Sequence, residues 1–528
     1  MEQKEIIEFC IKNGLLVDTE ILTLLSEVSD LESVKLILEI IKSHSGKKFI
    51  SKQVFYENKE QVKSFFSSLP QENQESLQSL KIKLGLSIEI SQEILTKNLI
   101  KSYVIPEKQD ARLVKVLSAN YSQGRKFGVE DFVATFRNRF SEIRNILQER
   151  PGLDNLVSIN KISGSRQGIS LVGIVYDKRV TKNKNIIFEV EDLTGKIKIL
   201  INKDKEDLVK KAENVVLDSV LGFKGSGNKE IIFASDIVFP ETFLLERKKS
   251  FVEEYAAFIG DVHYGSKKFF RESFLKFIDY LNGKVPNTPE VSKIKYLFIV
   301  GDLVTGVGVY PDQEKDLEVP DLERQFREIT ELLSKIRKDI TIILSPGNHD
   351  GVRLMEPQPL LDEKYAWPLH EIENVILTEN PSLVNIGARD GFSGLNVLTY
   401  HGFSYPYYAD NVPDLIKIRA MNSPEKIMEF LLMQRHLAPT QGSTQYFPNG
   451  KDIHVIKEVP DIFLSGHTHK SAVTYCNNVL VISVSTWEAV TAYQEKFGNI
   501  PDHCKVPLLN LKTRAVKILD FEQNENSN

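Results

Sequence analysis

The stretch Tyr296-Leu-Phe-Ile-Val-Gly-Asp302 places five apolar or aromatic residues directly before a glycine and an aspartate. A short, continuous apolar run that ends at glycine indicates a strand buried on both faces, as in a parallel sheet. The same texture recurs at Ala256–Ile259 and Ile340–Leu344, and helical periodicity fills the intervals at 269–281 and 322–336. Strands that alternate with helices predict a layered α/β domain with functional side chains on loops at the carboxyl ends of the strands.

Short polar motifs follow these strands. A single histidine after a glycine is most often a loop residue satisfied by hydrogen bonds. A series of such motifs in one domain, each after a predicted strand, is not expected by chance, so we interpret the set as one site. The motifs are Gly260-Asp-Val-His263, Gly301-Asp302, Gly347-Asn-His-Asp350, Tyr400-His-Gly402 and Gly466-His-Thr-His469. The candidate site residues are Asp261, His263, Asp302, Asn348, His349, Asp350, His401, His467 and His469.

Carboxylates, imidazoles and an amide together suit a pair of divalent metal ions. Hydrolysis of a phosphate ester at neutral pH needs a nucleophile and neutralisation of charge on the phosphoryl group, and two neighbouring divalent ions supply both. Such a pair requires one carboxylate that contacts both ions, for which Asp302 is the candidate. The mixed nitrogen and oxygen donors favour manganese, with iron and zinc as alternatives, over magnesium. A histidine that binds no metal can protonate the leaving oxygen.

These motifs, in this order, resemble the calcineurin-like metallophosphoesterase superfamily. The resemblance implies a role for each position. One ion would be bound by Asp261, His263, Asp302 and His469, and the other by Asp302, Asn348, His401 and His467. His349 would be the catalytic histidine, and Asp350 would orient it. Thr305 departs from the pattern, because many members of the superfamily carry an aspartate there; the difference removes a neighbouring carboxylate but no ligand.

Residues 151–245 have the texture of a small β-barrel. Strand-like runs are expected at 168–176, 186–191, 196–201, 215–223 and 231–239, with a helix at 206–212 after the third run. This order predicts an oligonucleotide/oligosaccharide-binding (OB) fold. Aromatic residues of the barrel could stack on single-stranded DNA or belong to the core, and we favour protein docking for this domain. These aromatic residues are Tyr176, Phe188, Phe223 and Phe233.

The whole chain is expected to be a multidomain α+β protein. Near the N-terminus, Leu, Ile and Val recur at three- and four-residue spacing between 21 and 41, which favours a small helical bundle over a docking module. A helix at 129–150 should carry Phe132, Phe136 and Phe140 on one face. The expected parts are a helical N-terminal domain at 1–85, a linker with a helix at 86–150, the OB-fold domain at 151–245, the α/β layered calcineurin-like phosphoesterase domain at 251–518 and a disordered tail at 519–528.

The composition is that of an ordinary globular protein. Of 528 residues, 41% are hydrophobic and 26% are charged, and the three cysteines make no disulfide framework. The charged N-terminus lacks the features of a signal peptide, and no apolar stretch reaches the ~20 residues that span a bilayer. We therefore expect a cytoplasmic protein with no membrane partner.

The formal net charge of −5 gives no global attraction to nucleic acid. Binding of DNA would then depend on a local patch, on metal ions or on a more basic partner. Lys267, Lys268 and Arg271, just after the first motif, are candidates for a local phosphate contact. A solvated helix face is the favoured account of these three residues.

Further motifs narrow the substrate; they lie at 347–359, 435–439, 459–469, 486–494 and 498–501. Together with the predicted barrel and helical module, they resemble the small subunits of archaeal family-D DNA polymerases. The resemblance implies a metal-dependent 3′-to-5′ exodeoxyribonuclease that proofreads for a DNA-directed DNA polymerase, while synthesis belongs to a separate large subunit. The implied partners are that large subunit and DNA with a 3′ end, with a sliding clamp as a further candidate, in a nucleoid-associated setting.

Two other interpretations stay open. A stand-alone metallophosphatase or phosphodiesterase would act on small phosphate esters without a partner, and it would not need the barrel. A mainly structural subunit for polymerase assembly would be expected to have lost metal ligands, and every ligand position of the motifs is filled in this chain.

Overall fold

The structure is a computed structural model of the chain. It describes residues 3–18, single positions between 22 and 50, residues 114–118, 126–150, 152–153 and 155–491, residue 495, and residues 500–522. The chain divides into two compact units, residues 1–108 and residues 109–528.

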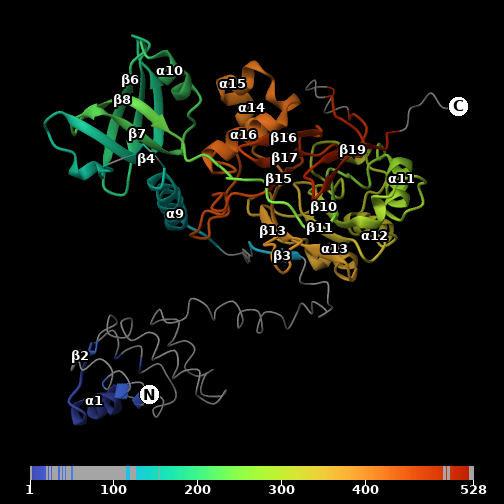
Figure 1. The fold of residues 1–528 in the computed structure, drawn as a ribbon, viewed down its shortest axis with the longest axis horizontal. Helices are drawn as coiled ribbons and strands as arrows, with labels where there is room; N and C mark the ends of the chain where they lie inside the picture. The colour runs from blue at the N-terminus through green and yellow to red at the C-terminus, as the bar shows by residue number, and fades with distance from the viewer. Residues whose placement is uncertain are drawn as a thin grey trace. The chain divides into compact units, whose positions relative to one another are not determined.

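In the first unit, helix α1 (Gln3–Lys12) precedes a two-stranded parallel sheet of β1 (Leu16–Val17) and β2 (Phe49–Ile50) (Figure 1). Ile6 on the inner face of the helix is 1% exposed. The predicted apolar repeat at 21–41 lies largely outside the described residues.

The second unit contains a closed five-stranded barrel with the strand order β4-β5-β6-β8-β7 (Figure 1). Its elements are β4 (Gln167–Val180), β5 (Ile186–Glu191), β6 (Lys196–Ile201), α10 (Glu206–Glu213), β7 (Val220–Gly227) and β8 (Ile231–Val238). Inward and outward side chains alternate along the strands, and Ile186, Phe188 and Val190 of β5 point inward and are buried. The predicted five-stranded barrel with a helix after its third strand is confirmed.

One strand of the barrel starts later than predicted. A strand is expected from 215, but β7 begins at Val220. The intervening Asp218 has a φ of 64°, which is incompatible with extended backbone, so the chain turns there before it enters the barrel.

The interior of the barrel is a packed core. Phe188 and Phe223 are fully buried, with ring centroids 6.1 Å apart. Phe233 is 46% exposed, and the guanidinium of Arg166 lies over its ring at 5.7 Å. Two of the aromatic residues considered for stacking therefore belong to the core.

Helix α9 (Val129–Gln148) precedes the barrel and matches the predicted helix at 129–150. Its buried residues Phe140, Ile143 and Leu147 share an apolar cluster with β4 and β7 of the barrel. The linker expected at 86–150 also contributes β3 (Val114–Val116), which pairs antiparallel with a strand of the C-terminal domain. The sequence does not single out this strand within the linker, because its partner strand is more than 250 residues away in sequence.

The C-terminal domain is a sandwich of two six-stranded sheets. The first sheet has the order β12-β11-β10-β9-β18-β19, and the second has the order β16-β17-β15-β14-β13-β3. The strands of the first sheet are β9 (Tyr255–Ile259), β10 (Ile294–Val300), β11 (Thr341–Ser345), β12 (Val375–Leu377), β18 (Lys505–Asn510) and β19 (Val516–Asp520). Those of the second, besides β3, are β13 (Ser382–Ile386), β14 (Leu395–Tyr400), β15 (Ile462–Ser465), β16 (Ala472–Cys476) and β17 (Val479–Ser483).

Apolar side chains hold four layers together. Phe258 and Phe298 of the first sheet pack against Val397 and Leu464 of the second, which forms the central core. Helices α11 (Arg271–Leu281), α12 (Leu322–Leu333) and α13 (Glu363–His370) cover the outer face of the first sheet. Helices α14 (Tyr405–Asn411), α15 (Pro413–Lys417) and α16 (Pro424–Gln434) cover the second. The predicted α/β layers are confirmed, and continuous apolar strands are expected where helices cover the sheets.

The C-terminal strand corrects one boundary. A disordered tail is predicted from 519, but β19 continues to Asp520 and pairs with β18. Residues 523–528 lie outside the described part of the chain. Among the residues that the structure describes, no helix is long and apolar enough to cross a membrane.

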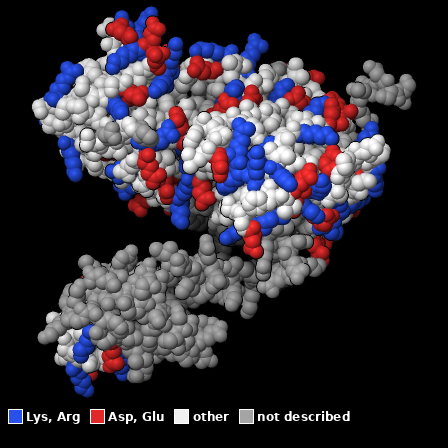
Figure 2. All heavy atoms as spheres, in the orientation of Figure 1, with Lys and Arg blue, Asp and Glu red and all other residues white. Residues whose placement is uncertain are grey.

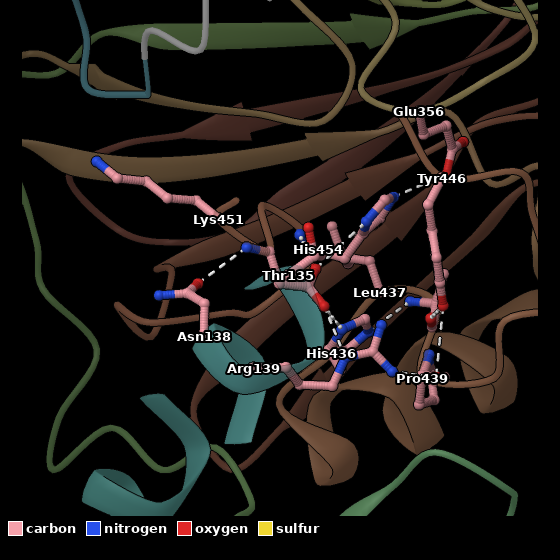
Figure 3. A network of polar contacts seen from close by, with 12 residues as sticks. Thr135, Asn138, Arg139, Glu356, His436, Leu437, Pro439, Tyr446, Lys451 and His454 are labelled. Atoms are coloured by element: carbon pink, nitrogen blue, oxygen red, sulfur yellow. Dashed lines mark hydrogen bonds and ion pairs between the residues drawn. The ribbon is translucent and has the colours of Figure 1, made fainter. Parts of the chain in front are cut away.

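A buried polar network joins α9 to the C-terminal domain (Figure 3). The Nε of Arg139 donates to Asp452 Oδ2 at 2.6 Å, and its Nη1 donates to the carbonyl of Pro439. Asp452 Oδ2 also accepts from His436 Nε2 at 3.0 Å. His454 extends this network, because its Nε2 lies 2.9 Å from Glu356 Oε2.

The charges in this network are defined by their surroundings. Burial by itself raises the pKa of Asp452, but Arg139 and His436 hold it well below its usual value. Burial and the nearby Arg139 lower the pKa of His436 to about 3, so this ring is neutral. Burial alone would lower the pKa of His454, but hydrogen bonds to Asp452 and Glu356 raise it to about 9. His454 is therefore an imidazolium at neutral pH.

Replacing Arg139 with Met should lower the free energy of unfolding by ~3–5 kcal/mol, because it leaves the buried Asp452 carboxylate without its cation. Denaturant unfolding of the full chain measures the change. Lys417→Met is the control, since the Lys417–Asp414 pair is exposed on both sides, and its unfolding midpoint should stay at the wild-type value. Wild-type stability of the Arg139 variant would contradict the role of the network.

The pH dependence of stability should contain a contribution from His454. Its pKa is about 9 in the folded chain and 6.5 as the ordinary value, so this contribution is fully present below pH 6.5. The contribution is lost as the pH rises through about 9. His454→Gln should therefore flatten the decline of the unfolding midpoint over this window, and identical slopes for variant and wild type would rule the assignment out.

Candidate metal centre

All of the predicted ligand motifs lie at the carboxyl ends of strands. Strands β9, β10 and β11 are parallel neighbours in the first sheet, and β14 and β15 are parallel neighbours in the second. Their carboxyl ends therefore bring loops from both sheets to one edge of the sandwich. The side chains that meet there come from Asp261, His263, Asp302, Asn348, His349, His401, His467 and His469.

Asp302 lies at the centre of this cluster and is 1% exposed. Its Oδ2 is 3.2 Å from His401 Nε2, 3.9 Å from His263 Nε2 and 4.0 Å from His349 Nε2. The other oxygen, Oδ1, accepts a hydrogen bond from the backbone N–H of His349 at 2.8 Å. One carboxylate thus faces imidazoles from three loops.

Two groups flank Asp302. On one side, His469 Nε2 lies 3.1 Å from His263 Nε2 and 3.5 Å from Asp261 Oδ1. On the other side, His401 and His467 lie with Asp302, and the ligand atoms of the three are within 4.8 Å of one another. Asn348 Oδ1 is 3.0 Å from His401 Nε2, which adds an amide oxygen to the second group.

His349 has a position of its own. Its Nε2 is near enough to His263 and Asp302 to be a third ligand group, so distance alone does not separate it from the ligands. Its side chain is 18% exposed, compared with 3% for His263 and 0% for His401. It is thus more accessible to a substrate than those two rings.

The expected partnership between Asp350 and His349 is wrong. Asp350 is 2% exposed, and its carboxylate accepts from the backbone N–H groups of Val304 at 3.0 Å and Gly347 at 2.8 Å. The Nδ1 of His349 lies 2.8 Å from the carbonyl oxygen of Thr305. Since a carbonyl can only accept, Nδ1 carries the proton. The backbone of Thr305 therefore orients His349, and Asp350 ties two of the loops together.

The backbone at the centre is strained. Asp261, His263, Asp302, His467 and His469 all have φ values between 47° and 67°, in the left-handed region that such residues rarely adopt. Strain of this kind collects at functional sites, where surrounding contacts maintain it. The main chain is bent at each ligand so that the side chains converge.

Glycines next to the ligands leave space for them. A Cβ on Gly347 would overlap both the carboxylate and the backbone nitrogen of Asp302, and a Cβ on Gly301 would overlap the ring of His401. Gly301 also has a φ of 78°. These glycines are required by the close approach of the loops.

Electrostatics at the centre are shaped by burial and by Asp302. Burial alone would raise the pKa of Asp302, but His401 and His349 hold it well below its usual value. Burial would lower the pKa of His401, but Asp302 raises it to about 10. Burial and His401 lower the pKa of His467 to about 3, so its lone pair is available. Burial and the nearby Asp302 raise the pKa of Asp350 to about 7.

The donor set fits divalent metal ions. Two imidazole nitrogens, those of His263 and His469, face each other at 3.1 Å, although they can share only one proton. Each of the three groups of possible ligands combines one aspartate with two histidines. Mixed nitrogen and oxygen donors of this kind bind manganese, iron or zinc, and the possible ligand atoms within each group of three lie within 4.8 Å of one another.

The basic residues after the first motif are already engaged. Lys267 Nζ donates to the carbonyl of Lys315 at 2.7 Å, and Lys268 Nζ donates to the carbonyl of Val490. The guanidinium of Arg271 donates to the hydroxyl of Tyr264. On the face shown in Figure 2, basic and acidic side chains are interspersed.

Sequence reasoning missed one acidic residue at the centre. Glu488 is 5% exposed and close enough to His469 for the two to influence each other's pKa; burial raises that of Glu488. It lies within the motif at 486–494, which is the only feature of the sequence that pointed to Glu488 as part of the site.

A family model for calcineurin-like phosphoesterases matches residues 256–471. The DNA polymerase II small subunit of Methanothermobacter thermautotrophicus is 36% identical over 406 residues, which are 76% of this chain and 81% of that protein. The chain belongs to the DNA polymerase II small subunit family. Both predicted resemblances are thereby confirmed.

Other members of this family align over similar lengths. The DNA polymerase II small subunit of Pyrococcus furiosus is 38% identical over 417 residues, which are 77% of this chain and 66% of that protein. That of Pyrococcus horikoshii is 36% identical over 87% of this chain and 74% of its own. A solved archaeal phosphodiesterase covers 50% of this chain and 98% of its own at 13% identity, with a TM-score of 0.25, too low to add to this assignment.

Gly347→Ala should weaken metal binding roughly 10- to 100-fold, the usual effect of disturbing the surroundings of ligands, because the new methyl group displaces Asp302. Titration calorimetry with Mn²⁺ measures it. Gly442→Ala is the matched control, because the nearest atom to its Cβ is 3.8 Å away on Tyr407. Wild-type affinity in a folded Gly347 variant would show that Asp302 is not a ligand.

Proposed function

We propose that this chain is a metal-dependent 3′-to-5′ exodeoxyribonuclease that removes terminal nucleotides from DNA for a polymerase whose synthesis is performed by a separate large subunit. Membership of the DNA polymerase II small subunit family supports the setting. The calcineurin-like phosphoesterase match supports the hydrolytic chemistry.

The observation that carries the proposal is the convergence of a complete donor set on Asp302. A subunit with a purely structural role would gain nothing from the strained backbone at Asp261 and His467. Each such residue costs ~1–3 kcal/mol and persists only where the surrounding structure enforces it. A functional centre explains why this strain is retained, and it favours an active subunit over a structural one.

We assign the residues to two ions through the central carboxylate. One ion would be held by Asp261, His263, Asp302 and His469, and the other by Asp302, Asn348, His401 and His467. When bound, the ions supply charge neutralisation at the phosphate and activation of the attacking water. Manganese is the expected metal, with iron and zinc as alternatives.

His349 is the proposed acid. Its Nδ1 proton is committed to the carbonyl of Thr305, which directs Nε2 toward the cluster and leaves that atom for the substrate. In the doubly protonated ring, Nε2 can donate to the departing 3′-oxygen. The partial exposure of this side chain is what such contact with substrate requires.

We propose that DNA is bound largely by the large subunit. The chain has a formal net charge of −5, and the three basic residues after the first motif bind protein groups. The same observation fits the alternative of a stand-alone phosphodiesterase, whose small substrates need no basic groove. A sliding clamp is a further proposed partner.

Exonuclease activity on a mismatched primer terminus tests the proposal. With Mn²⁺ and the large subunit, the wild type should shorten the 3′ strand, and chelation of metal should stop it. Asp302→Asn should abolish cleavage and weaken metal binding. His349→Ala should lower kcat by ~10²–10⁴-fold, the usual contribution of a general acid, with metal affinity retained.

Asp414→Asn is the control, since this acid is 61% exposed in an ion pair on α15. Cleavage at the wild-type kcat in His349→Ala would exclude the acid role. Hydrolysis of bis(p-nitrophenyl) phosphate by the isolated chain, with DNA left intact even with the large subunit, would instead support the stand-alone phosphodiesterase.

A further inference from the structure

We propose that Gln313 is a positioning residue for His349, acting through the carbonyl of Thr305; the inference rests on the proposed function of His349. Gln313 opens a short 3-10 helix, η3 (Gln313–Lys315), in the segment that follows Asp302. It does not belong to any of the ligand motifs. Its side chain is nevertheless 1% exposed, which is unusual for glutamine.

The carbonyl of Thr305 joins the two residues. The Nε2 amide of Gln313 donates to this oxygen at 2.8 Å, and His349 Nδ1 lies 2.8 Å from the same atom. A carbonyl oxygen has two lone pairs, so both bonds can form at once. The oxygen that orients the catalytic ring is therefore itself held by a side chain.

The other end of the Gln313 amide fixes the same loop. Its Oε1 accepts from the backbone N–H of Val309 at 2.8 Å. One buried amide thus spans the turn from Thr305 to Val309 and binds both of its ends.

A second buried glutamine holds the neighbouring residue. Gln325 of α12 is 0% exposed, and its Oε1 accepts from the N–H of Gly306 at 3.0 Å. Its Nε2 donates to the carbonyls of Gly306 at 3.1 Å and Val319 at 2.7 Å. Gly306 has a φ of 73°, and a Cβ there would overlap the carbonyl oxygen of His349. The loop therefore lies against the backbone of His349, and position 306 has no room for a side chain.

The two buried glutamines do here what a β-sheet does elsewhere. A carbonyl in a loop is not fixed by sheet hydrogen bonds, and the orientation of the His349 ring depends on the position of the Thr305 carbonyl. Buried amides are unfavourable unless all their polar atoms are bonded, and Gln313 and Gln325 each have both ends bonded. We infer that these amides are buried, despite the cost, because His349 Nε2 must be oriented accurately toward the substrate.

Gln313→Met keeps the size of the side chain and removes both hydrogen bonds. With the chain in complex with the large subunit, kcat for 3′-end cleavage should fall ~10-fold, because small displacements of a catalytic group are costly. KM and Mn²⁺ affinity should stay within about twofold, since no ligand is touched. Gln313→Glu, which keeps the bond from Val309 but offers no donor to Thr305 when ionised, should lower kcat similarly.

A double-mutant cycle separates positioning from general damage. In the His349→Ala background, Gln313→Met should cause no further loss, because the ring that it positions is gone. A loss of equal size in both backgrounds would overturn the proposal, and so would wild-type kcat in Gln313→Met. Gln434→Met is the matched control, since Gln434 is a buried glutamine of α16 whose Nε2 has no hydrogen-bond partner among the residues that the structure describes.

Nitrogen-15 spectra of histidine-labelled protein provide a readout that does not need activity. The Nδ1–H signal that disappears in His349→Ala identifies this ring. In Gln313→Met that signal should broaden or shift, whereas Gln434→Met should leave it unchanged. An unchanged signal in Gln313→Met would overturn the positioning role. Absence of hydrolysis in the wild type with the expected spectra would instead contradict the proposed function alone.

Discussion

The centre of this protein depends on one buried carboxylate. Asp302 has almost no contact with water, yet its pKa is held well below the usual value by the imidazoles around it. A buried anion is costly unless cations and hydrogen bonds surround it. His401, His263 and His349 meet that requirement from three different loops, and the proposed metal ions would meet it more fully. The strained backbone and the glycines around the cluster follow from bringing these loops together.

Two sheets are needed to form this cluster. Asp302 and His263 come from the first sheet, whereas His401 and His467 come from the second. The layer of apolar side chains between the sheets sets their separation, which is about 10 Å in stacked sheets generally. The two proposed ligand groups each combine residues from both sheets, so neither is complete until that core has packed, and the proposed chemistry is tied to the stability of the sandwich.

The sequence predicts the strands and their motifs because buried parallel strands are continuous apolar runs with the functional residues directly after them. It does not predict features that depend on distant pairing or on the direction of a single side chain. The short β3 depends on β13, and the partner of His349 depends on whether Asp350 points toward the ring or toward the backbone. Gln313 belongs to no periodic pattern, so its role appears only in the folded loop.

The network that holds α9 and the cluster around Asp302 share a strand. Tyr400, the last residue of β14, donates its hydroxyl to Glu356 Oε2 at 3.2 Å, and the same oxygen accepts from the His454 imidazolium. The next residue in the chain is His401, whose Nε2 faces Asp302. The network of alternating charges that begins at Arg139 therefore ends at Tyr400, the residue directly before the proposed ligand His401. Packed interiors transmit strain, so a displacement of α9 would also displace the end of β14. There the ligand residues of the first sheet meet those of the second.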